Sequence, residues 1–131
     1  MAVVINGSTG ITTPDVDVSD ELKFNSGYGS AATAYGCRAW VNFNGSGTPA
    51  IRDSGNVSSI TDNGVSDYIV NFTTSMPDVN YSACISGEGL VGINGQWAGS
   101  VELVALATSS VRMAQISVAS DPTTVCVSIF R

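Results

Sequence analysis

From residue 37 to the end of the chain, short runs of alternating apolar and polar residues recur, each bounded by residues that favour turns. Alternation with a period of two places the apolar side chains on one face of an extended strand. Several short strands at such spacing are typical of an antiparallel β-sandwich or barrel. We expect strands at Cys37–Phe43, Ala50–Ser54, Val57–Ile60, Asp67–Thr74, Tyr81–Gly87, Val101–Thr108, Val111–Ala119 and Thr124–Phe130.

The same alternation predicts which side chains form the core. The apolar faces of three runs are Cys37, Ala39, Val41 and Phe43; Tyr68, Val70 and Phe72; and Val125, Val127 and Ile129. The opposite faces of the first two runs carry Trp40 and Ile69. A strand that is apolar on both faces indicates burial on both sides, as at a subunit interface. We therefore expect Trp40 to have a structural role.

Turn signals separate the predicted strands. Three Asn-Gly pairs, at residues 44–45, 63–64 and 94–95, are typical of type I′ turns because both residues tolerate positive φ. Residues 101–119 contain some helix formers, but Ser109-Ser110 interrupts them and Val and Thr lie near the centre. We therefore expect a hairpin there. Residues 120–123 are expected to close the last hairpin.

The first 36 residues show no sustained periodicity and are rich in small residues. We expect them to form an extended arm that cannot build a core alone and is ordered by a partner chain. Residues 37–131 are expected to form a small antiparallel β-sandwich, jelly-roll-like in its connectivity. The apolar residues of the arm are candidates for attachment to that partner; they are Val3, Val4, Ile5 and Ile11.

The charge of the chain argues against several classes of partner. Charged residues make up 12% of the 131 residues, the net charge is −6, and only five residues are Lys or Arg. Binding to phosphates requires clustered basic residues, and anionic lipids repel an acidic surface. The longest apolar run, Val101–Ala107, is too short to span a bilayer. We expect neither nucleic-acid binding nor membrane insertion.

The residues needed for most catalytic sites are missing. The chain contains no histidine, which excludes Ser-His and Cys-His nucleophiles and histidine metal sites. A carboxylate pair could still serve as acid and base in a glycosidase, although most candidates lie in turns, where Asp caps its own backbone. These candidates are Asp53, Asp62, Asp67, Asp78, Glu88 and Glu102. The acidic segment 15–21 could bind a divalent cation, but a solvated arm is favoured. We predict no enzyme, cofactor or metal site.

The three cysteines, Cys37, Cys84 and Cys126, each lie in a strand-like run. We expect them to be reduced residues of the core, and a disulfide between two of them is the less favoured alternative. The opening "MAVVINGSTG" has no basic region and only a short apolar run, unlike a secretory signal. These features favour folding in a cytoplasm.

The glycine-rich stretch Gly87–Ser100 is the strongest candidate for ligand contact. An aromatic side chain beside amide groups can stack on a sugar ring and bind its hydroxyls. The candidate residues are Glu88, Asn94, Gln96 and Trp97. The alternative is that Trp97 packs on the sandwich core or on a neighbouring subunit. Tyr28 and Tyr35, also near glycines, are weaker candidates of the same kind.

Three phrases carry a family resemblance: Arg38–Gly45, "IRDSGNVSSITDNG" and "YIVNFTTSMPDVNY". Their combination, within Arg38–Ser82, resembles tail-fibre-like proteins of tailed bacteriophages, especially phages of aquatic bacteria including cyanobacteria. The resemblance covers about a third of the chain, and the opening "VVINGSTGITTP" also looks like phrases that precede such domains. Long fibres carry repeat arrays, which this sequence lacks, so the resemblance implies a short fibre.

The resemblance implies a trimeric virion protein of the phage tail, made in the host cytoplasm. Its arm, residues 1–36, would attach to tail or baseplate proteins, and residues 37–131 would contact a glycan or protein of the host surface. A polysaccharide receptor is expected to be neutral or bridged by calcium. The alternative is a capsid decoration or baseplate protein without a receptor role. The resemblance carries no catalytic motif.

Overall fold

The computed structural model describes residues 22–24, 30–88, 101–115 and 120–131. The chain divides into two units, Met1–Ala34 and Tyr35–Arg131. In the first unit, β1 (Lys23–Phe24) pairs antiparallel with β2 (Ala32–Thr33), and the Ala34 N–H donates to the Leu22 carbonyl oxygen at 2.7 Å. The four residues predicted to attach the arm, Val3, Val4, Ile5 and Ile11, lie outside the described residues.

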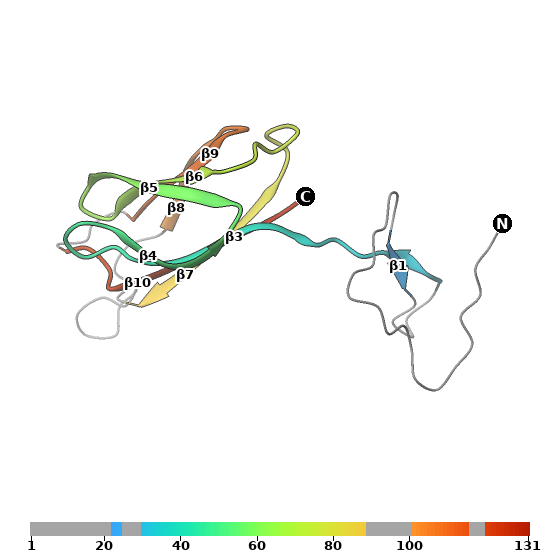
Figure 1. The fold of residues 1–131 in the computed structure, drawn as a ribbon, viewed down its shortest axis with the longest axis horizontal. Coiled ribbons are helices and arrows are strands. Elements are labelled where there is room, and N and C mark those ends of the chain that lie inside the picture. The colour runs from blue at the N-terminus through green and yellow to red at the C-terminus, as the bar shows by residue number, and fades with distance from the viewer. Residues whose placement is uncertain (1–21, 25–29, 89–100, 116–119) are drawn as a thin grey trace. The chain divides into compact units, whose positions relative to one another are not determined.

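The second unit is built from two antiparallel sheets of four strands each (Figure 1). Its strands are β3 (Cys37–Asn44), β4 (Ala50–Gly55), β5 (Val57–Gly64), β6 (Asp67–Phe72), β7 (Ser82–Glu88), β8 (Val101–Leu106), β9 (Ser110–Gln115) and β10 (Thr124–Phe130). Each predicted strand is present, with ends that differ by a few residues. The described part of the chain holds no helix of the length and hydropathy needed to cross a bilayer.

The first sheet has the strand order β4-β3-β10-β7, and the second has the order β5-β6-β9-β8. Consecutive strands pair as hairpins within a sheet at β3–β4, β5–β6 and β8–β9. The antiparallel sandwich and the predicted hairpin within residues 101–119 are thus confirmed, whereas the jelly-roll connectivity is not. The expectation for residues 120–123 was wrong, because this segment crosses from β9 in one sheet to β10 in the other.

The four central strands supply most of the core. The three predicted apolar faces are buried from Ala39 to Phe43, Tyr68 to Phe72 and Val125 to Ile129, as alternation required. Val111 and Met113 of β9 complete the facing layer. Phe43 of the first sheet meets Tyr68 of the second edge to face, with ring centroids 5.2 Å apart. This contact, favourable for aromatic rings, joins the two sheets.

The prediction that the cysteines are core residues was wrong. Cys37 and Cys84 are exposed, Cys126 is half-buried, and all three thiols are free. The physical reason is strand parity: Val125 and Val127 occupy the inward positions of β10, so Cys126 points outward. Cys37 shares the parity of Ala39 but lies at the start of β3, beyond the buried layer.

Two of the predicted Asn-Gly turns also differ from expectation. Asn63 and Gly64 belong to β5, and the turn falls at Val65 and Ser66. Gly64 has a positive φ of 127°, and Ser66 in the turn has a positive φ of 55°. Ser66 is buried, its N–H donates to Asp121 Oδ1 at 2.8 Å, and its hydroxyl donates to the Ser120 carbonyl at 3.2 Å. These tertiary bonds select the turn register over local Asn-Gly propensity.

In the turn after β3, Gly47 has the positive φ, 70°, rather than Asn44 or Gly45. Gly45 is instead required by close packing, because a Cβ there would lie 2.5 Å from the Tyr68 hydroxyl and 2.8 Å from the Pro122 carbonyl oxygen. The third predicted turn, at residues 94–95, lies outside the described residues.

Strand register defines the two ends of the first sheet. At one end, Thr124 of β10 lies opposite Glu88 of β7. At the other end, Phe130 lies opposite Ser82 and opposite Cys37 at the start of β3. The segment between β6 and β7 returns the chain to this second end, which we call the Phe130 end.

Candidate functional site

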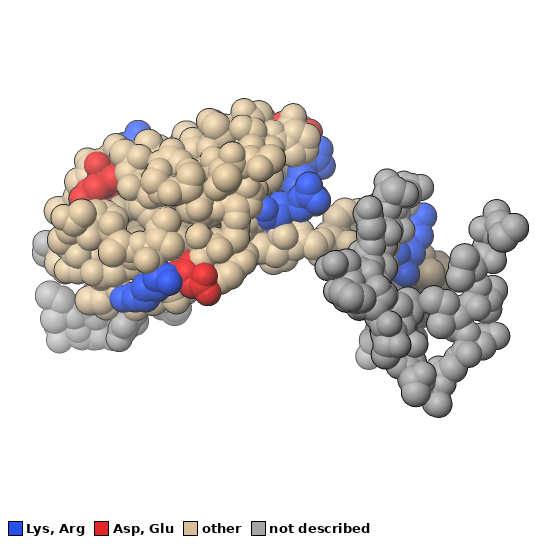
Figure 2. Space-filling model, viewed as in Figure 1, with Lys and Arg blue, Asp and Glu red and all other residues tan. Residues whose placement is uncertain are grey.

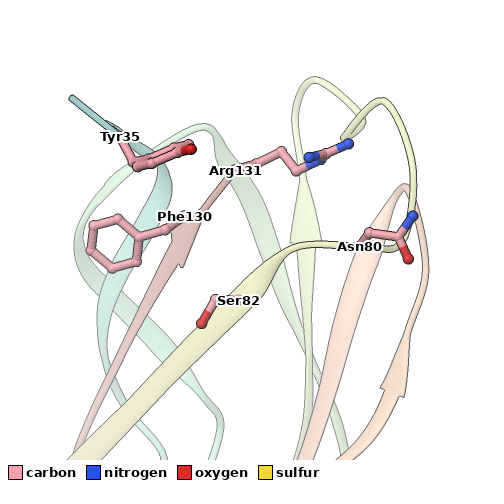
Figure 3. A pocket seen from close by; sticks show the side chains of 5 residues that line it. All are labelled: Tyr35, Asn80, Ser82, Phe130 and Arg131. Atoms are coloured by element: carbon pink, nitrogen blue, oxygen red, sulfur yellow. The ribbon is translucent and has the colours of Figure 1, made fainter. Parts of the chain in front are cut away.

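A hollow with a volume of about 420 Å³ opens at the Phe130 end of the first sheet (Figure 3). Its lining residues are Tyr35, Asn80, Ser82, Phe130 and Arg131. Figure 3 places the rings of Tyr35 and Phe130 toward one side of this hollow and Asn80 toward the other, with Ser82 between them. The hollow therefore has an aromatic side and a polar side, and we refer to it as the Phe130 hollow.

Local structure explains how these side chains reach the surface. Val127 and Ile129 point into the core, so the next residue along β10, Phe130, points outward and remains 37% exposed. Ser82 is its partner on β7. Tyr35 lies just before β3 and is 76% exposed. Both rings are therefore exposed and line the same hollow.

Tyr81 fixes the backbone between Asn80 and Ser82. Its ring is buried, packs edge to face on Phe72 at 6.0 Å, and its hydroxyl lies 2.9 Å from the carbonyl oxygens of both Ala107 and Ser110. Burial raises the pKa of the Tyr81 hydroxyl. Because these bonds reach the β8–β9 turn, the polar side of the Phe130 hollow is tied to the second sheet.

The charged group of the hollow is neutralised by a neighbour. The Arg131 guanidinium donates to Asp78 Oδ2 at 2.5 Å, and Asp78 Oδ1 accepts the Asn80 N–H at 2.8 Å. The hydrogen bond from Arg131, followed by that from the Asn80 backbone, holds the pKa of Asp78 below its usual value. Arg131 therefore adds donors to the hollow with its charge already compensated.

Several polar groups of the hollow remain available. Within the described part of the chain, the hydroxyls of Ser82 and Tyr35 have no hydrogen-bond partner, and the Asn80 side chain lies beside the Asp78 carboxylate. None of the lining residues is a carboxylic acid, so no acid–base pair faces the hollow. This set of groups, two rings with an amide and hydroxyls, is of the kind that contacts a ligand reversibly.

The structure does not bring the sequence-predicted ligand residues to this hollow. Glu88 ends β7 opposite Thr124, at the far end of the sheet from Phe130. Asn94, Gln96 and Trp97 lie outside the described residues, as does Tyr28. Tyr35 alone among the candidates lines the hollow. Phe130 was not predicted, because only the inward residues of β10 drew attention, although the outward parity of Phe130 could have indicated it.

The structure also shows where Trp40 and two of the candidate carboxylates, Asp67 and Asp78, lie. Trp40 lies on the outer face of β3, 40% exposed, where its indole covers Gly55 of β4, so that a Cβ on Gly55 would lie 2.5 Å from Nε1. Of the candidate carboxylates, Asp67 accepts from Arg112 at 2.6 and 2.9 Å, and Asp78 from Arg131. Among the described residues, no three His, Cys, Asp or Glu side chains gather as a metal site.

The described surface carries few charged side chains on the face drawn in Figure 2. On the face drawn in Figure 2, most of the described surface is neither acidic nor basic, and basic side chains lie in separate places. On that face the described residues form no continuous track of positive charge of the kind that follows a phosphate backbone.

Comparisons of the chain with protein-family models, with curated proteins and with solved structures found no match.

Proposed function

We propose that the protein is a virion component of a tailed bacteriophage, a short tail fibre whose sandwich contacts the host cell surface. The Phe130 hollow carries this proposal. Two exposed rings, an amide and two hydroxyl groups stand on an antiparallel frame, and the nearby Asp78 carboxylate is paired with Arg131. Such a site favours reversible contact with a surface molecule over catalysis.

The sequence resemblance within Arg38–Ser82 supports the placement in a phage tail. That segment contains β3 from its second residue, then β4 to β6 and the first residue of β7, so it includes part of both sheets and the polar side of the hollow. In this proposal residues 1–36 attach the protein to the tail or baseplate, three copies assemble, and the protein is made in the host cytoplasm before incorporation into the virion. The receptor is a glycan or protein of the host surface, with no nucleic acid and no membrane insertion.

Binding of the purified, fluorescently labelled protein to cells tests the proposal. Strains of aquatic bacteria, cyanobacteria included, would be incubated with the protein with and without calcium, and with and without competing phage. We expect saturable binding to the host strain and reduced phage adsorption when the protein is in excess. A folded protein that binds no strain the phage infects would contradict a receptor-binding role.

A second candidate function is a capsid decoration or baseplate protein that contacts only other virion proteins. The edge strand β8 favours it, because three of its large apolar side chains, Leu103, Val104 and Leu106, are between 38% and 45% exposed. An edge strand with exposed apolar side chains is suited to packing against another chain. Cosedimentation with fibre-less tails and with empty capsids distinguishes this role from host attachment.

A further inference from the structure

The Phe130 hollow is amphipathic in a way that restricts its ligand. Its aromatic side, formed by Tyr35 and Phe130, offers π-faces with negative character, and its polar side offers the Asn80 amide and the Ser82 hydroxyl (Figure 3). A purely apolar ligand would leave these polar groups without hydrogen bonds. A strongly polar ligand without an apolar face would gain nothing from the rings.

We propose that the Phe130 hollow binds a neutral pyranose sugar, an inference that rests on the proposed host-surface function. A pyranose ring has one face of C–H groups and a periphery of hydroxyls. The C–H face packs against Tyr35 and Phe130, and the hydroxyls exchange hydrogen bonds with Asn80 and Ser82. An amide both donates and accepts, as does a hydroxyl, so both protein groups match the dual character of sugar hydroxyls.

The charge of the hollow selects a neutral sugar over an acidic one. Arg131 is the basic residue of the lining, and its guanidinium is already paired with Asp78 at 2.5 Å. A uronic or sialic acid would have to compete with that carboxylate, on a chain whose net charge is −6. Binding of a neutral sugar involves no such exchange of ion pairs, and we expect it to depend little on salt.

The size of the hollow sets the length of ligand it takes. Its volume of about 420 Å³ lies in the lower part of the range for small-molecule sites. That space suits a monosaccharide or a disaccharide end of a surface polymer. Because the site is open and shallow, we expect a dissociation constant on the order of 1 mM for a single sugar.

A titration of the full-length, isotopically labelled protein followed by NMR tests this inference. The probes are the methyl glycosides of glucose, galactose and mannose, with methyl glucuronide as the acidic comparison. We expect saturable shifts in the signals of Tyr35, Phe130 and Asn80 with at least one neutral glycoside. The shifts should persist in about 0.5 M salt, where electrostatic attraction is largely screened. The glucuronide should bind more weakly.

Variants separate stacking from loss of fold. Tyr35→Ala removes an exposed ring and should weaken binding about tenfold, whereas Tyr35→Phe keeps the ring and should stay within about threefold. Asn80→Ala removes the amide of the polar side and should weaken binding several-fold. Val65→Ala, in the exposed turn after β5, is the matched control and should leave binding unchanged. Amide spectra show whether each variant remains folded.

The outcomes distinguish this inference from the proposed function. Saturable cell binding with no shift from any neutral glycoside, at concentrations about twentyfold above 1 mM, would overturn the sugar site and leave host attachment standing. Sugar binding without cell binding would support the site and overturn host attachment. Shifts of the Tyr35 and Phe130 signals on dilution of the protein, but not with sugar, would make the hollow a subunit contact and overturn the inference.

Discussion

The Tyr68 hydroxyl lies 2.9 Å from Oδ1 of Asp121, a residue 53 positions further along the chain. The same carboxylate oxygen accepts the N–H of Ser66, and the Tyr68 hydroxyl also lies 3.1 Å from the Gly45 carbonyl oxygen. One buried phenol and one carboxylate therefore join the turn after β3, the turn after β5 and the crossover before β10. This cluster closes the end of the sandwich opposite the Phe130 hollow.

Replacement of Tyr68 by phenylalanine should destabilise the protein by about 1.5–3 kcal/mol, because a hydrogen bond to a charged group is lost in a buried place. Urea unfolding measures the change. Tyr35→Phe is the matched control, since its exposed hydroxyl has no partner in the described part of the chain, and it should change stability by less than about 0.5 kcal/mol. Equal effects of the two variants would contradict the assigned role of the Tyr68 hydroxyl.

Replacement of Gly45 by alanine should destabilise the protein by about 1–3 kcal/mol, since the new methyl group would overlap the Tyr68 hydroxyl and the Pro122 carbonyl. Gly36→Ala provides the control, because a Cβ at Gly36 meets no atom within 4 Å. Thermal and urea unfolding of both variants test the contrast. A stability for Gly45→Ala equal to that for Gly36→Ala would show that the turn relaxes freely.

Acid should weaken the sandwich partly through Asp67. Hydrogen bonds from Arg112 hold the pKa of Asp67 below its usual value of 3.8, although burial opposes this. A carboxyl whose pKa is lower in the folded state stabilises the fold above its unfolded pKa, and the contribution disappears as the pH falls through the folded pKa. Stability should therefore decline below about pH 4.

Asp67→Asn should flatten this acid decline but not abolish it, because the pKa of Asp78 is also lowered. Arg112→Gln should flatten it to a similar extent, since both variants remove the same ion pair. The double variant should then add little to either single one. Unfolding curves at a series of acidic pH values measure the slopes, and additive effects would show that the two residues act independently.

The outward cysteines should react with thiol reagents in the native state. Cys37 and Cys84 are exposed and Cys126 is half-buried, so two thiols should be alkylated quickly and the third more slowly. Mass spectrometry after brief treatment with iodoacetamide identifies the modified residues. Protection of Cys84 in an assembled protein, with reaction after dissociation, would indicate that the outer face of the first sheet is covered by another subunit.

The sequence predicted the buried side chains well where the alternation within a single strand determines them. Alternation alone identified the buried faces that include Val41, Val70 and Val127, because a strand has only two faces and one of them meets the core. Residue type misled for Cys126, because its apolar character suggested burial whereas the alternation of β10 places it outward. It also failed at Ser66, where bonds to a distant carboxylate determine the turn and no neighbouring residue indicates it.

The candidate site could not be predicted in the same way. The Phe130 hollow forms where the segment before β3, the start of β7 and the end of β10 meet. These segments come together because β10 pairs with both β3 and β7, which are distant in the sequence. Tyr35 carried a signal, as an aromatic residue beside small residues. Asn80 carried none, because its role depends on Tyr81 and Asp78 beside it, and on an arginine 53 positions after Asp78.

The most direct test of the account compares the binding of labelled wild-type protein and the folded Tyr35→Ala variant to host cells, with Val65→Ala as the control. We expect saturable binding that blocks phage adsorption for the wild type and for Val65→Ala, and a loss of about tenfold in affinity for Tyr35→Ala. Equal binding of all three proteins would contradict the role of the Phe130 hollow, and no binding by any of them would contradict host attachment itself.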